Sequence, residues 1–190
     1  MSSPALLLFL ELDGVLVLNG STKRAYVADA VRSVASGESD WQDHQELWDH
    51  LFAPEPIRQL QILHNQFKPT YCLTSYWTAT MDRSATLIVL NLCGLGFVGR
   101  NLHARWETES AKSAPGRAVA IEKWLGTNPD HKELWAALDS DQHDSAGAQF
   151  VELHADYSVR CCRDVGLSNF ETKKLQAAFL QRLRESTLRS

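Results

Sequence analysis

Short apolar runs, separated by segments with helical periodicity, dominate the pattern of this chain. Apolar runs of this kind are typical of strands in a parallel sheet, because helices cover both faces of such a sheet. The predicted strands are residues 5–12, 69–74, 134–138, 150–153 and 158–162. We therefore expect an α/β fold: a Rossmann-like three-layer sandwich around a central, mostly parallel sheet of about five strands.

Amphipathic helices are predicted between and after these strands. Apolar residues recur at helical spacing in 24–36, in a segment opened by Pro56, in 79–93, in 115–125 and in 169–186. Gly94 and Gly96 are candidate C-caps of the third of these helices. Ser168 and Glu171 have the spacing of a capping box, which predicts the start of the last helix.

The stretch 18–68 separates the first two predicted strands and is longer than one crossover helix requires. Helical spacing returns at Trp41–Phe52 after a polar loop. We expect two or three helices and a loop, forming a helical insertion or lid above a pocket. The amino-acid composition does not change along the chain in a way that would mark a second domain, so residues 1–190 are predicted to form a single domain.

Composition and charge exclude several classes of protein. The net charge of −4 gives no long-range attraction to polyanions. The apolar run Ala5–Leu10 is too short for a signal peptide, and no run is long enough to span a membrane. Cysteines 72, 93, 161 and 162 are predicted to be packing residues in a reducing compartment. We therefore expect a cytoplasmic protein without a membrane partner, whose oligomeric state stays open.

Polar residues follow two of the predicted strands directly. Glu11 and Asp13 are spaced i and i+2, so both carboxylates face one side of the extended chain, and Gly14 permits a sharp turn. Thr74 and Ser75 form a hydroxyl pair after the second strand. Because ligands bind at the carboxyl ends of strands in open parallel sheets, these groups are expected to converge.

Further charged residues complete this constellation. Asp139, Ser140, Asp141 and Asp144 follow the strand at 134–138, and Lys112, Arg117 and Lys123 lie before or within the 115–125 helix. Lys112 can reach inward, whereas Lys123 at mid-helix fits a solvated face. Carboxylates, hydroxyl donors and a cation together suit a phosphoryl group bridged to Mg²⁺.

The order of these motifs resembles that of the haloacid dehalogenase (HAD) superfamily, and the resemblance covers most of the chain. The motifs LELDGVL, LTSYW, AIEKWL, ALDSDQHD and RDVGLS look like a bacterial branch with a minimal cap, related to the HAD domain of RNA-repair proteins. Members of this superfamily usually attack a phosphate with a strand-end aspartate, and water then hydrolyses the aspartyl-phosphate.

The resemblance assigns roles to individual residues. It implies Glu11 as nucleophile, Asp13 as general acid/base, Thr74 or Ser75 as the phosphate-binding hydroxyl and Lys112 as the stabilising cation. The implied metal ligands are Glu11, Asp13, Asp139 and Asp141, with Asp144 as an alternative. Ser75, Gly14 and Trp77 are the candidate substrate-binding residues, although Trp77 also fits a core position.

Two departures from the family pattern predict weakened catalysis. Glu11 stands where the family has aspartate, and its extra methylene moves the carboxylate by about 1.5 Å, whereas errors of about 1 Å in attack geometry can cost about a hundredfold. Ser140 stands where close relatives often carry another aspartate, so Asp141 or Asp144 has to replace it as a ligand.

These observations predict a Mg²⁺-dependent phosphohydrolase of impaired activity, acting on a small phosphorylated substrate. A nucleic-acid end is the less favoured substrate because of the negative net charge. Two alternatives stay open. The chain is either a catalytically inactive HAD-fold binding module, or an active phosphatase in which a natural aspartate has been replaced by Glu11.

Overall fold

The computed structural model describes residues 6–18, 20–108, 116–129, 134–140 and 154–189. A five-stranded sheet with the order β3-β2-β1-β4-β5 forms its centre, and all its strand pairings are parallel. The strands are β1 (Leu7–Leu10), β2 (Thr70–Leu73), β3 (Leu102–Glu107), β4 (Trp135–Ser140) and β5 (Ser158–Cys161). The predicted α/β sandwich with a parallel sheet is therefore confirmed.

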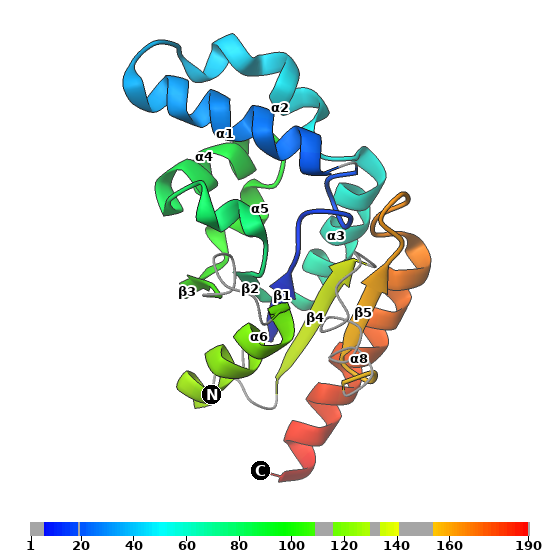
Figure 1. The fold of residues 1–190 in the computed structure, drawn as a ribbon. Coiled ribbons are helices and arrows are strands. Elements are labelled where there is room, and N and C mark those ends of the chain that lie inside the picture. The colour runs from blue at the N-terminus through cyan, green and yellow to red at the C-terminus, as the bar shows by residue number, and fades with distance from the viewer. Residues whose placement is uncertain (1–5, 19, 109–115, 130–133, 141–153, 190) are drawn as a thin grey trace.

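Helices cover both faces of this sheet (Figure 1). The α-helices are α1 (Gly20–Ser36), α2 (Gln45–Leu51), α3 (Pro54–Phe67), α4 (Arg83–Leu92), α5 (Gly96–Arg100), α6 (Gly116–Thr127) and α8 (Asn169–Arg189). Two short 3₁₀ helices, η1 (Trp41–His44) and η2 (Tyr76–Ala79), precede α2 and follow β2. α6 lies on one face of the sheet, and α3 and α8 lie on the other.

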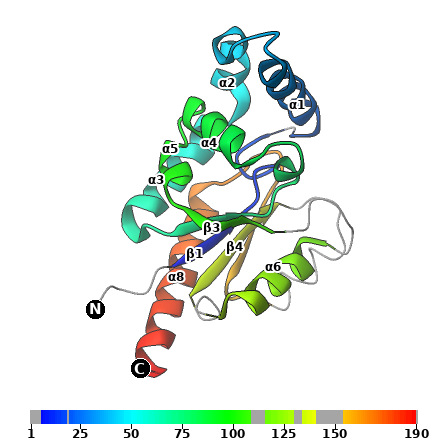
Figure 2. The same ribbon diagram turned by 90° about the vertical axis from the view of Figure 1, so that its left-hand side faces the viewer.

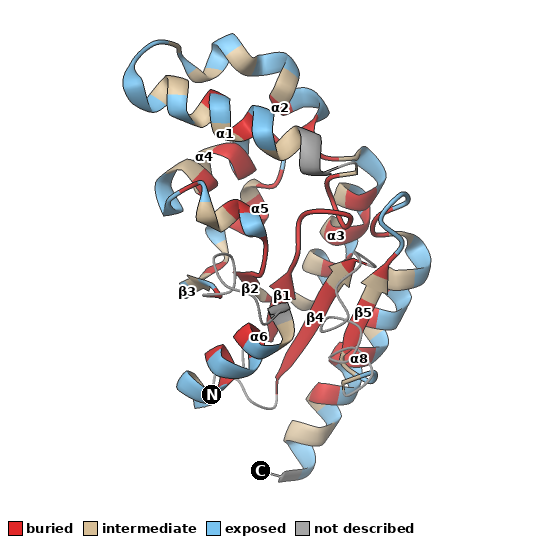
Figure 3. Ribbon diagram, viewed as in Figure 1, coloured by how far each residue is buried: buried red, intermediate tan, exposed pale blue. Residues whose placement is uncertain are grey.

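Buried residues lie along the strands and on the helices around them (Figure 3). They form two apolar clusters, one on each face of the sheet. Successive strand residues alternate between the clusters, because neighbouring side chains of a strand point to opposite faces. On β1, Leu8 and Leu10 join the larger cluster with α3 and α8, whereas Leu7 and Phe9 join the smaller cluster with α6. The central strands β1, β2 and β4 are thus buried on both sides, which explains their continuous apolar runs.

The structure differs from the sequence prediction at several elements. Strand β3 was not predicted, because most of its residues are exposed or half-buried at the sheet edge. The predicted strand 150–153 lies outside the described residues. The predicted helix 79–93 begins later, as α4 at Arg83, and Asp82 caps it by accepting the backbone N–H of Ala85. Gly96 begins α5, so it is not a C-cap.

Local predictions at two other places are confirmed. Ser168 and Glu171 make the predicted capping box at the start of α8: the Ser168 backbone N–H donates to the Glu171 carboxylate, and the Ser168 hydroxyl accepts the backbone N–H of Phe170. Cys161 is buried and its neighbour Cys162 is exposed, as strand alternation requires.

The long segment between β1 and β2 divides into two parts with different positions. α3 packs its apolar face against the sheet beside α8 and belongs to the sandwich. α1 and α2 lie beyond the carboxyl ends of the strands (Figure 2). Lys23 fixes α1 to α2, because its ammonium donates to the carbonyls of His50 and Leu51 near the end of α2.

No helix within the described ranges combines the length and the apolar character that a membrane crossing needs.

Candidate functional site

The register of the sheet places three predicted site residues side by side. Leu10, the last residue of β1, pairs with Leu73 of β2 and with Leu138 of β4. Beyond this row, the Glu11 N–H donates to the Leu138 carbonyl at 3.0 Å, and the Thr74 N–H donates to the Leu10 carbonyl at 3.0 Å. Glu11 therefore lies at the carboxyl edge with Thr74 on one side and Asp139 on the other.

Strand alternation also puts these three residues on one face of the sheet. Side chains two residues apart on a strand share a face. The residues two and four positions before them that pack in the α6-facing cluster are Leu7, Phe9, Cys72, Trp135 and Ala137. Glu11, Thr74 and Asp139 continue these rows. Glu11, Thr74 and Asp139 thus belong to the side of the sheet that α6 covers.

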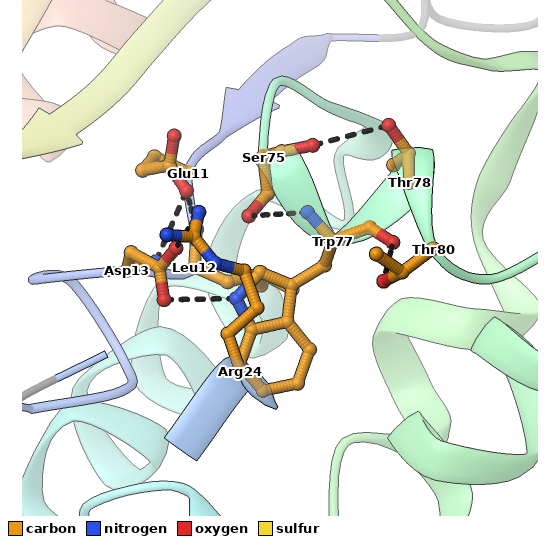
Figure 4. A network of polar contacts seen from close by, with 8 residues as sticks. All are labelled: Glu11, Leu12, Asp13, Arg24, Ser75, Trp77, Thr78 and Thr80. Atoms are coloured by element: carbon orange, nitrogen blue, oxygen red, sulfur yellow. Dashed lines mark hydrogen bonds and ion pairs between the residues drawn. The ribbon is translucent and has the colours of Figure 1, made fainter. Parts of the chain in front are cut away.

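The Glu11 carboxylate is fully buried and turned back onto its own loop (Figure 4). Its Oε1 accepts the backbone N–H groups of Leu12 at 2.8 Å and Asp13 at 3.0 Å. Burial of a carboxylate is costly, and these two hydrogen bonds offset part of that cost. Successive backbone N–H groups in a turn form an anion-binding concavity. The glutamate therefore occupies a position where an incoming anion could bind.

Asp13 is held by two side chains from distant elements. The Trp77 indole Nε1 donates to Asp13 Oδ1 at 2.8 Å, and Arg24 Nη1 lies 3.5 Å from Asp13 Oδ2. Trp77 comes from η2 and Arg24 from α1, so the segments after β2 and β1 converge on this carboxylate (Figure 4). Sequence reasoning missed Arg24, since nothing in its local pattern distinguishes it from a solvated helix residue.

Trp77 is a buried residue with a polar function. Its ring stacks on Phe52, with the ring centroids 6.2 Å apart. Ser75 caps the 3₁₀ helix that carries Trp77, because the Ser75 hydroxyl accepts the Trp77 backbone N–H at 3.5 Å. The predicted hydroxyl residue Ser75 thus positions Trp77, and Trp77 in turn positions Asp13.

The turn after Asp13 depends on a glycine. Gly14 has φ +72°, and a Cβ on it would lie 2.6 Å from Ser140 Cβ. The segment after β5 supports the same turn, because the Leu167 N–H donates to the Val15 carbonyl at 2.9 Å. Ser140 therefore packs against the turn, on the opposite face of β4 from Asp139. Its buried hydroxyl has no hydrogen-bond partner among the described residues.

Other predicted site residues are placed only in part. Lys112, Asp141 and Asp144 lie outside the described residues. Lys123 is exposed on α6, as expected for a solvated face. Within the described ranges, no three His, Cys, Asp or Glu side chains gather as a metal site. Glu11 and Asp139 nevertheless fit Mg²⁺, which proteins usually hold with one or two carboxylates while it keeps several waters.

Two cysteines near the core are not nucleophiles. Burial, with a smaller contribution from the charge of Glu107, raises the pKa of the Cys72 thiol far above its usual range. Burial also raises the pKa of Cys93 to about 12, and the charge of Asp49 adds to the shift. Both thiols are protonated at neutral pH and lack the reactive thiolate form.

We expect Trp77→Phe to lower the free energy of unfolding by about 1–3 kcal/mol, because it leaves the buried Asp13 carboxylate without its indole donor. Trp124→Phe is the matched control, since the buried Trp124 indole donates to the neutral carbonyl of Arg105 at 3.1 Å. Urea denaturation of both variants should show the larger loss for Trp77→Phe. Equal losses of unfolding free energy would mean that the hydrogen bond to the Asp13 carboxylate contributes no more than the one to a neutral carbonyl.

Comparison with known proteins found one family that matches most of the chain. The family model described as "HAD domain in Swiss Army Knife RNA repair proteins" matches residues 7–171, which includes every described site residue. No curated protein and no solved structure matches the chain.

Proposed function

Since the chain belongs to the family of HAD domains in Swiss Army Knife RNA repair proteins, we propose that it is a Mg²⁺-dependent phosphohydrolase acting on phosphomonoesters. The observation that carries this proposal is the position of Glu11 at the carboxyl edge, between Thr74 and Asp139. A nucleophilic carboxylate, a hydroxyl donor and a second carboxylate in one row are the groups that phosphoryl transfer requires.

The proposed reaction has two steps. A Glu11 carboxylate oxygen forms a bond to phosphorus while the bond from phosphorus to the leaving oxygen breaks, and Asp13, in its protonated carboxylic acid form, gives that oxygen its proton. Asp13 then takes a proton from water, whose oxygen attacks phosphorus and releases phosphate from Glu11. The products are the alcohol and inorganic phosphate, and both carboxylates return to their starting state.

The remaining groups bind the phosphate. Thr74 is a buried residue, and its hydroxyl makes no hydrogen bond to any described residue, so it is available to a phosphate oxygen. Lys112 is the proposed stabilising cation. Glu11, Asp139 and the Asp13 backbone carbonyl would hold Mg²⁺, with Asp141 as a further candidate ligand. When bound, Mg²⁺ neutralises charge on the phosphate and orients it.

A second function, binding without turnover, is favoured by one observation. The Glu11 carboxylate accepts hydrogen bonds from the Leu12 and Asp13 backbone N–H groups, and in this position it does not point toward a phosphate that it could attack. A chain that keeps this arrangement with ligand present would bind a phosphorylated molecule and not cleave it. The family name also raises a nucleic-acid end as the phosphorylated substrate, beside small phosphomonoesters.

Calorimetric titration with Mg²⁺ tests the proposed metal site. We expect Asp139→Asn to weaken Mg²⁺ binding at least about tenfold, equivalent to roughly 1.4 kcal/mol, because it removes one of few charged ligands. Asp156→Asn is the control, since exposed Asp156 precedes the amino end of β5, away from the site. Equal affinity in the parent and in Asp139→Asn would exclude Asp139 as a ligand.

A further inference from the structure

We propose that Arg24 and Tyr76 form a subsite for a second phosphate and a planar ring on the leaving-group side of Asp13. The substrate class that fits is a terminal phosphate on an oligonucleotide, in which the next phosphodiester meets Arg24 and a base stacks on Tyr76. This inference rests on the proposed function, because the role of Asp13 defines the leaving-group side.

Arg24 is weakly held in the free protein. Its hydrogen bond to Asp13, at 3.5 Å, lies at the long limit for such a bond. A guanidinium has five N–H donors. The other donors of Arg24 have no hydrogen-bond partner in the described part of the chain, and about 33% of its side chain is exposed. An arginine that served only to fix a carboxylate would favour shorter, bidentate contacts.

Arg24 stands beside an exposed ring. Its guanidinium carbon lies 5.6 Å from the centroid of the Tyr76 ring, and Tyr76 is 40% exposed. Trp77, the next residue, is buried and committed to Asp13. An exposed aromatic ring next to a cation is the combination with which proteins bind nucleic-acid strands, since bases stack on rings and phosphates pair with cations.

The position of Arg24 indicates that it binds the leaving group and not the scissile phosphate. Glu11 and Thr74 lie at adjacent strand ends. Arg24 instead reaches Asp13 from α1, beyond the carboxyl edge (Figure 4). α1 itself is fixed to α2 by Lys23, which donates to two carbonyls there. The guanidinium is therefore presented from an anchored helix, which reduces the entropy lost when it binds a ligand.

The first test compares two substrates in the Glu11→Asp background. The probes are phenyl phosphate and a diribonucleotide phosphorylated at its 3′ or 5′ end. We expect Arg24→Gln to lower kcat/KM for the dinucleotide at least tenfold more than for phenyl phosphate, mainly through KM. Arg24→Lys should recover only part of this loss, because an ammonium lacks the planar fork. Tyr76→Leu should also lower the ratio of kcat/KM for the dinucleotide to kcat/KM for phenyl phosphate. Arg32→Gln, in the exposed α1 pair with Asp29, should leave the ratio unchanged.

An equal loss on both substrates would overturn the proposal and leave Arg24 as a positioning residue for Asp13. Absence of hydrolysis of every probe would contradict the proposed function, and the subsite is then tested by binding. In calorimetry with the parent chain, Arg24→Gln should weaken binding of the phosphorylated dinucleotide at least tenfold and binding of inorganic phosphate less. Equal dinucleotide affinity in the parent and the variant would overturn the subsite.

Discussion

Glu11→Asp should raise the rate of aryl phosphate hydrolysis at least about tenfold, which corresponds to roughly 1.4 kcal/mol of activation free energy. In-line attack needs the carboxylate oxygen at about 3–3.5 Å from phosphorus. The longer glutamate instead turns back and accepts the N–H groups of Leu12 and Asp13. Aspartate removes one methylene, which releases these amides for a phosphate oxygen and restores the approach of the nucleophile.

The control for this prediction is Glu11→Asp combined with Asp13→Asn. It should abolish the gain, because an asparagine amide is too weak an acid to protonate the leaving oxygen. The steady-state rate on an aryl phosphate under saturating Mg²⁺ is the measurement. If Glu11→Asp stays as inactive as the parent, Ser140 or the helices above the site are the deeper defect. The binding module is then the better account of this chain.

Gly14→Ala should lower the free energy of unfolding by at least about 2 kcal/mol, the largest loss of stability that we expect from one methyl group. A side chain at positive φ costs about 1–2 kcal/mol, and crowding in a packed interior adds about 1–3 kcal/mol. Both apply here, because Gly14 has φ +72° and the new Cβ would lie 2.6 Å from Ser140 Cβ.

Gly37→Ala separates these two effects. Gly37 has φ +77°, but nothing lies within 4 Å of its Cβ position, so this variant measures the backbone cost alone. Chemical denaturation should show a larger loss for Gly14→Ala than for Gly37→Ala. Ser140→Gly should reduce that difference in a double-mutant cycle. Equal losses of unfolding free energy at the two glycines would show that Ser140 moves away from the new methyl group at no free-energy cost.

The central strands, and the positions of Glu11, Thr74 and Asp139 at their carboxyl ends, could be predicted from the sequence because buried parallel strands are continuously apolar. β1 and β4 are examples of such strands, and Glu11 and Asp139 mark the carboxyl edge of the sheet in the sequence. β3 escaped prediction because it lies at the sheet edge, where polar residues such as His103 and Arg105 interrupt the apolar pattern. A strand of this kind is defined by its pairing with β2, which local sequence does not reveal.

The fine structure of the site depends on contacts between residues far apart in the sequence. Sequence motifs assigned Asp13 a role, but they could not show that Trp77 and Arg24 both reach its carboxylate. The contact between Ser140 and Gly14 is equally non-local. The sequence marked Ser140 only as a departure from the family pattern, and it could not show that this residue packs against the turn from the opposite face of β4 to Asp139.

A crystal structure of Glu11→Asp grown with Mn²⁺ and orthovanadate, a phosphate mimic, tests the central claim most directly. The proposal predicts vanadate beside the carboxylate of residue 11, with Thr74 and the Leu12 amide on its oxygens. It also predicts the metal on Asp139 and the Asp13 carbonyl. Vanadate and Mn²⁺ bound elsewhere, with the carboxyl edge of β1 and β4 empty of both, would contradict it.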